Sequence, residues 1–163
     1  MKPQYRFLDE WQVPLPIEQV YDLVGEPKRY PDWWGAVFLA AEGEGGPPEP
    51  GKATHVTARG FLPYRLRFTL TCTAVERPHR IESVLSGDFE GSGTWLLEER
   101  DGGTRAQLDW RPAVAKPLVR RLTPVLRPLF RANHNWTMRR GNEAIQRLAV
   151  AAGPSGAAGR APL

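Results

Sequence analysis

The chain has 163 residues, of which 41% are hydrophobic and 25% charged, so we expect one globular domain and no room for two of typical size. The formal net charge of +4 is a mild basic excess, which does not by itself indicate a nucleic-acid-binding protein. No apolar stretch approaches a membrane span of about eighteen residues, and MKPQYRFLDE lacks the apolar run of a secretion signal, so we expect a cytoplasmic protein.

The N-terminal segment predicts one strand followed by two short helices. YRFLDEWQVP alternates between apolar and polar residues up to Pro14, as a strand does. Apolar residues then recur at helical spacing as far as Gly25, and a second helical turn starts near Tyr30. It ends on two adjacent tryptophans, which cannot share one direction. We expect Trp34 to border an interior space and Trp33 to pack under the first helices, or the reverse.

The middle of the chain predicts further strands joined by short turns. Period-two patterns occur in AVFLAAEGEG, ATHVTARGF, YRLRFTLTCTAV, RIESVLSG, GTWLLEER and RAQLDWRPAV. The joints, including GDFEGSG, carry turn residues and predict antiparallel pairing. In the third run, Leu66, Phe68, Leu70 and Cys72 share one face, which predicts a sheet with one dry and one wet face. Cys72 is the only cysteine and is expected to be a core thiol.

The C-terminal segment changes to helical spacing. Pro124 and Pro128 are predicted to break or kink its first part, leaving an uninterrupted helix from about Leu129 to Val150. Residues 151–163 lack the apolar bulk needed for packing, so residues 1–150 form the predicted domain and the rest a disordered tail. This helix is the only long element that can cover the dry face of the sheet.

The helical stripe expected to face the sheet is apolar at both ends and small or polar in its middle. Asn133, Thr137 and Gly141 stand where a helix that only seals a sheet would carry leucine or isoleucine. We therefore predict a cavity beneath the helix. In the alternative, aromatic side chains from the sheet fill this volume and the polar groups bond within the core.

The same segment concentrates positive charge. Glu143 is the only acidic residue between positions 116 and 147. The basic residues there are Lys116, Arg120, Arg121, Arg127, Arg131, Arg139, Arg140 and Arg147. They form either the solvated back of the helix or a surface for an anionic ligand, a membrane or a partner.

The order and spacing of several segments resemble a known family. These segments are PIEQVYDLVGEPKRYPDWW, GFLPYRLRF, SGDFEGSGTWLL, TRAQLDWRPAV and NHNWTMRRG. Together they resemble the polyketide cyclase/dehydrase and lipid-transport proteins of the START and birch-pollen-allergen-like (SRPBCC) helix-grip superfamily. The resemblance covers roughly Tyr5 to Val150. It implies an α+β helix-grip fold: a curved antiparallel sheet of six or seven strands around a long C-terminal helix, with two short helices after the first strand and an internal pocket for a hydrophobic or amphipathic molecule.

The sequence offers few groups for catalysis. The three histidines lack metal-ligand spacing, and no nucleophile elbow or phosphate-binding loop is present, so we expect neither a metal nor a cofactor. What remains is acid–base chemistry by His134, with Arg140 as a cation for a carboxylate or enolate. We expect Asp109 to pair with an arginine on the wet face. No carboxylate is predicted to enter the pocket.

Three functions stay open from the sequence. The first is a carrier or sensor that binds a lipid, isoprenoid or polyketide-like molecule in the cavity. The ligand-binding residues predicted for it are Trp34, Phe68, Trp95, Trp110, Phe130, Asn133, Thr137 and Gly141. The second is a polyketide cyclase, aromatase or dehydratase that uses His134 and Arg140. The third is membrane-surface or partner binding through the basic helix, whereas no nucleic-acid partner is expected. The ligand and the oligomeric state stay undetermined.

Overall fold

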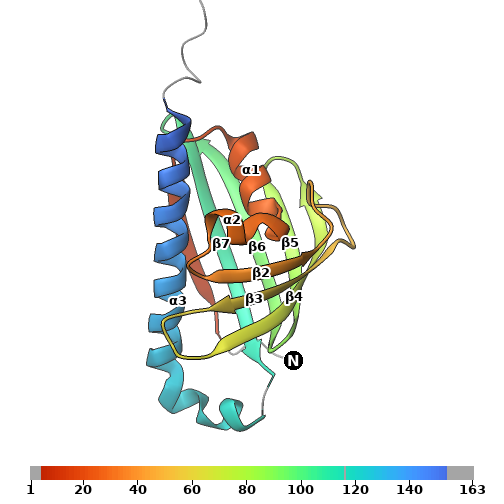
Figure 1. Ribbon diagram of the computed structural model, residues 1–163, viewed down its shortest axis with the longest axis vertical. Helices are drawn as coiled ribbons and strands as arrows, with labels where there is room; N and C mark the ends of the chain where they lie inside the picture. The colour runs from red at the N-terminus through yellow and green to blue at the C-terminus, as the bar shows by residue number, and fades with distance from the viewer. Residues whose placement is uncertain (1–4, 116, 154–163) are drawn as a thin grey trace, which may run out of the picture.

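A computed structural model of the protein describes residues 5–115 and 117–153. Seven strands form one antiparallel sheet in the order β1-β7-β6-β5-β4-β3-β2, which confirms the predicted fold class (Figure 1). The strands are β1 (Phe7–Val13), β2 (Phe38–Gly43), β3 (Ala53–Arg59), β4 (Arg65–Glu76), β5 (Arg80–Gly87), β6 (Phe89–Arg100) and β7 (Gly103–Val114). The helices are α1 (Ile17–Gly25), a 3-10 turn at Pro27–Arg29, α2 (Tyr30–Trp33) and α3 (Pro117–Ala152).

The alternating patterns place one face of the sheet inward, as predicted. On β4, Phe68, Leu70 and Cys72 are buried while the arginines on the other face are exposed. One expected turn is wrong: β6 already begins at Phe89, so Glu90 lies in a strand rather than in a turn. The reason is that the glycines in this stretch tolerate the left-handed conformation without ending the strand; Gly91 has φ +125° and still pairs with Pro112.

Helix α3 runs along the edge of the sheet that is formed by β1, as Figure 1 shows. It is one helix that contains Pro124 and Pro128, and in Figure 1 its first turns bend away from the long rod. The predicted kink is therefore present, but the helix is not interrupted, because a proline can be accommodated by a bend. Its C-terminal end reaches Ala152, two residues beyond the predicted domain boundary, and the rest of the predicted tail lies outside the described residues except for Gly153.

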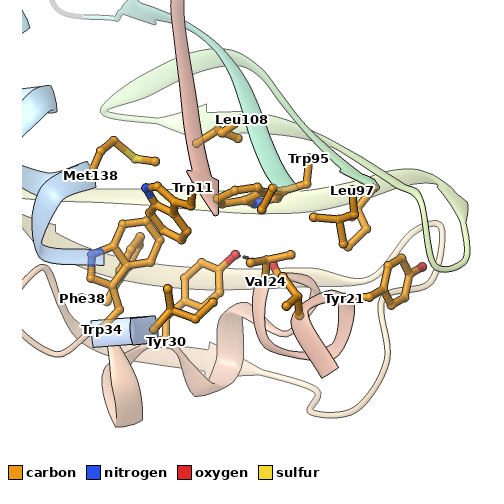
Figure 2. Packing of buried hydrophobic residues seen from close by; sticks show 14 of the residues in the cluster. Trp11, Tyr21, Val24, Tyr30, Trp34, Phe38, Trp95, Leu97, Leu108 and Met138 are labelled. Atoms are coloured by element: carbon orange, nitrogen blue, oxygen red, sulfur yellow. Dashed lines mark hydrogen bonds between the residues drawn. The ribbon is translucent and has the colours of Figure 1, made fainter. Parts of the chain in front are cut away.

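The hydrophobic core lies between the sheet and the helices α1, α2 and α3. Figure 2 shows aromatic rings from all sides meeting there, with Trp11 and Trp95 from the sheet beside Trp34 and Tyr30. Met138 extends from α3 toward the same cluster. Among the described helices, none combines the length and hydrophobicity that a membrane crossing requires.

The buried face of α3 is rotated from the predicted one. Helical spacing puts Met138 and Ile145 on one margin of the predicted stripe and Leu129 on the other. Met138 and Ile145 are among the most buried residues of the helix, whereas Leu129 is 40% exposed. The rotation follows from the position of α3: the helix packs against the edge strand β1, so the side facing β1 is covered more completely than the opposite side.

Candidate functional site

A cavity of about 170 Å³ lies inside the fold, between the inward face of the sheet and α3. Its wall is mainly apolar and comes from all seven strands and from the helices α1, α2 and α3. The predicted hollow is therefore present. For scale, an engineered protein cavity of about 150 Å³ holds a benzene molecule, so the space admits a group of roughly that size without rearrangement.

Seven of the eight predicted ligand-binding residues line this cavity. They are Trp34, Phe68, Trp95, Trp110, Phe130, Asn133 and Thr137. The sheet contributes three of the rings, because inward positions on β4, β6 and β7 fall on the same face as the core. These rings narrow the cavity without filling it. Each of the two predictions, an open cavity beneath the helix and a volume occupied by aromatic rings of the sheet, therefore holds in part.

Gly141 is the exception, and its expected role is wrong. Instead of leaving an opening, its Cα is covered by two tryptophans: a Cβ at this position would lie 2.8 Å from the Trp11 ring and closer still to Trp34. The Trp34 indole is held there by its Nε1–H, which donates to the Thr137 carbonyl at 3.1 Å. The absence of a side chain at Gly141 thus makes room for Trp34, and Trp34 in turn forms part of the cavity wall.

The two adjacent tryptophans divide their roles in one of the ways predicted. Trp34 is 4% exposed and borders the cavity, whereas Trp33 packs partly buried against the core and does not line it. Their rings remain in contact, with centroids 5.4 Å apart.

Asn133 links α3 to the loop between β3 and β4 by a hydrogen bond. Its Oδ1 accepts a hydrogen bond from the Leu62 backbone N–H at 3.4 Å, and a Cβ at Gly60 would overlap its side chain. Thr137 uses its hydroxyl within the helix, donating to the His134 carbonyl at 2.7 Å. Both residues line the cavity, so two of the three small or polar positions border it as expected.

His134 also lines the cavity and has a carboxylate partner that the sequence reasoning missed. Its Nε2 lies 2.6 Å from Asp9 Oδ2, and its ring stacks on Phe7 with centroids 4.0 Å apart. Both side chains are largely buried, with 12% and 18% exposed. When Nε2–H donates to Asp9, the neutral imidazole keeps its lone pair on Nδ1, which is the arrangement of an oriented base.

The inward position of Asp9 has a readable signal in the sequence. Phe7, Asp9, Trp11 and Val13 occupy alternate positions of β1; Trp11 and Val13 belong to the core, and Phe7 lines the cavity. A strand places all such residues on one face. Asp9 itself does not line the cavity, and no carboxylate is among the described lining residues. The sequence reasoning missed the carboxylate behind His134, because the period-two pattern was read only for its apolar members.

Arg140 is not at the cavity. Its guanidinium donates to Glu143 at 3.2 Å and lies over the Trp136 ring at 5.3 Å, and its side chain is 45% exposed. The backbone position is near the margin of the inward stripe, but the long side chain extends to solvent. The structure thus separates the two residues that were predicted to act together.

Two other ionisable side chains, Asp109 and Tyr30, have shifted pKa values. Asp109 accepts hydrogen bonds from Arg111 and Arg6, which lower its pKa to about 2 and confirm the predicted pairing on the wet face. Burial raises the pKa of Tyr30, whose hydroxyl donates to the Val24 carbonyl. Within the described part of the chain, no cluster of three His, Cys, Asp or Glu residues could hold a metal ion.

Residues 6–150 match the family described as Polyketide cyclase / dehydrase and lipid transport. A START superfamily protein from Mycobacterium smegmatis is similar in structure, with a TM-score of 0.66 and 14% identity over 90% of this chain and 98% of that one. The protein TTHA0849 from Thermus thermophilus gives a TM-score of 0.74 and 19% identity over 91% of this chain and 99% of that one.

The ginseng major latex-like protein 151 from Panax ginseng gives a TM-score of 0.64 and 8% identity over 90% of this chain and 97% of that chain. At such low identities these likenesses concern the fold. No curated protein matches the sequence.

Proposed function

Because the chain belongs to the polyketide cyclase/dehydrase and lipid transport family, we propose that it binds a hydrophobic or amphipathic small molecule as a carrier or sensor. The bound molecule would be a lipid, an isoprenoid or a polyketide-like compound, held between the sheet and α3. The proposal keeps the cytoplasmic location expected from the sequence.

The cavity itself is the observation that carries this proposal. It measures about 170 Å³ and its wall is built from rings and aliphatic side chains, including Trp34, Phe68 and Trp95. Burial of an apolar group in such a space releases about 25 cal/mol per Å² of surface removed from water. Asn133, His134 and Thr137 line the wall on the side of α3, where an amphipathic molecule would find hydrogen-bonding partners for its polar end.

The proposal can be tested with N-phenyl-1-naphthylamine, an uncharged apolar fluorophore. Ala58 lines the cavity and is 6% exposed, so Ala58→Leu should fill part of the space and weaken probe binding at least tenfold. Ala40→Leu is the matched control, because it makes the same change at an exposed position of the neighbouring strand β2. Equal affinity in the wild type and both variants would contradict binding in the cavity.

The pair formed by Asp9 and His134 favours proton transfer as a second candidate function. A family of cyclases and dehydrases needs a base that removes a proton next to a carbonyl, and an imidazole oriented by a carboxylate suits that step. In this scheme Nδ1 of His134 takes the proton from the substrate carbon, which leaves an enolate, and later returns it.

The test separates chemistry from binding. His134→Ala should reduce turnover of a poly-β-keto substrate far more than it reduces affinity, while Arg140→Ala should change neither, since Arg140 points to solvent. Equal losses of turnover and affinity in His134→Ala would contradict the hypothesis that the protein is an enzyme and favour its function as a carrier.

A further inference from the structure

The cavity has its solvent-accessible end between the β3–β4 loop and the first half of α3. Among the residues of its wall, Arg59 and Tyr64 are exposed and Phe130 is half-buried. At the opposite end, the lining residues Val24 and Cys72 are buried. This uneven exposure places the entrance beside the loop, which in Figure 1 reaches across to α3.

Large apolar side chains are exposed on the β3–β4 loop and on the first part of α3. They are Phe61 (46%), Tyr64 (39%), Leu122 (48%), Val125 (80%) and Leu129 (40%), and we call them the mouth patch. Five of the nine exposed large hydrophobic residues of the described chain belong to it, so this surface is concentrated rather than scattered.

The members of the mouth patch lie on two adjoining elements. Leu122, Val125 and Leu129 follow one another in the first part of α3 at intervals of three and four residues, which is the spacing of one helical face. Leu129 precedes Asn133 by about one helical turn, and Asn133 bonds to Leu62 of the loop that carries Phe61 and Tyr64. The loop part of the mouth patch therefore adjoins α3 at Asn133, and its helical part continues from there toward the start of α3.

Exposed arginines lie on the same part of α3 as the mouth patch. The segment from Pro117 to Asn142 contains no aspartate or glutamate. Its exposed arginines include Arg120, Arg121 and Arg131. The carboxylates Asp88 and Glu90 lie on the sheet, at the start of β6. The helix side of the entrance is therefore both apolar and cationic.

We propose that this side of the entrance docks on the surface of an anionic lipid bilayer. Exposed aliphatic residues next to arginines are the combination that inserts into the headgroup region while neutralising its negative charge. A nucleic acid would use the arginines but would leave Val125 and Leu129 in water. Docking in this way turns the cavity entrance toward the membrane, so an apolar ligand could enter or leave without crossing bulk water. This consequence rests on the proposed function, whereas the docking itself does not.

Vesicle flotation with the full chain tests the proposal. The wild type should float with phosphatidylcholine vesicles that contain about 30% phosphatidylglycerol in about 0.1 M salt, and bind at least tenfold more weakly to pure phosphatidylcholine. Raising the salt to about 0.5 M should release it, since the charges are then screened. Equal binding to both vesicles, or binding to duplex DNA in preference to vesicles, would overturn it.

Two matched pairs of variants locate the contact. Val125→Glu should reduce vesicle binding at least tenfold, whereas Val150→Glu should not, although both valines are on α3 and are 80% and 79% exposed. Likewise Arg121→Glu should weaken binding about fivefold or more, and Arg147→Glu at the far end should have little effect. Equal effects within either pair would contradict docking through the mouth patch.

The readouts for docking and for the cavity are independent. Val125→Glu should retain N-phenyl-1-naphthylamine binding in solution, because Val125 does not line the cavity. If the wild type failed to bind this probe and the vesicle pattern still held, the proposed cavity function would fail and the docking surface would stand. If the probe bound but the vesicle pattern were absent, docking would be refuted alone.

Discussion

Replacing Gly141 by alanine tests the packing that shapes the cavity. In the middle of an exposed helix this change stabilises a protein by about 1 kcal/mol, because glycine has the greater backbone freedom when unfolded. At Gly141 the added Cβ would stand 2.8 Å from the Trp11 ring and nearer to Trp34, whereas carbon atoms pack at about 3.5–4 Å.

Neither ring can yield easily. Trp34 donates to the Thr137 carbonyl at 3.1 Å, and Trp11 is packed between Trp34 and Trp95 with centroid distances of 5.4 and 5.3 Å. Overpacking of this kind costs about 1–3 kcal/mol. With two rings to displace, the upper half of that range applies, so after the helical gain Gly141→Ala should lower the free energy of unfolding by about 1–2 kcal/mol.

Urea unfolding followed by far-ultraviolet circular dichroism measures this loss without relying on tryptophan fluorescence. In the background of Trp34→Phe, whose side chain lacks the indole atoms nearest Gly141, the same change should become neutral or stabilising. A Gly141→Ala variant that is about 1 kcal/mol more stable than the wild type would refute the close packing.

Three further results are expected. Asp109→Asn should cost about 1 kcal/mol at pH 7, a value reduced because its arginine partners are exposed. Since the native pKa of about 2 lies below the ordinary value of about 4, this stabilisation should fade in acid unfolding experiments as pH falls from about 4 to about 2; a constant difference would contradict the pairing. Tyr30→Phe should cost about 1–2 kcal/mol in urea unfolding by leaving the buried Val24 carbonyl without its donor, and a neutral result would argue against that bond. Combining Asp9→Ala with His134→Ala should reveal a coupling of about 1–3 kcal/mol in a double-mutant cycle, whereas additive losses would speak against the contact.

The elements of the fold could be predicted from local patterns. Alternation identified all seven strands, and the change to helical spacing identified α3, because these periods follow directly from backbone geometry. The two prolines predicted the bend in α3, but they did not show that the helix continues through it. Whether a proline breaks or only bends a helix depends on what packs around it, which the pattern does not contain.

The site could be predicted only in part, for reasons that particular residues illustrate. A helical projection gives the direction of a Cα–Cβ bond but not the side chain that approaches it, so Gly141 was taken for open space although Trp34 occupies it. The projection also says little about Arg140, whose long side chain leaves the margin for solvent. Asp9 was predictable in principle from the alternation of β1, but its partner His134 is 125 residues away in the sequence.

Native mass spectrometry of the wild type and Ala58→Leu, purified in parallel from the host, tests the central claim most directly. The account predicts that the wild type carries a non-covalently bound small molecule of apolar or amphipathic character and that Ala58→Leu has lost most of it, while Ala40→Leu retains it. A wild-type chain that is bare under gentle conditions and takes up no apolar probe, or a bound molecule retained in full by Ala58→Leu, would contradict it.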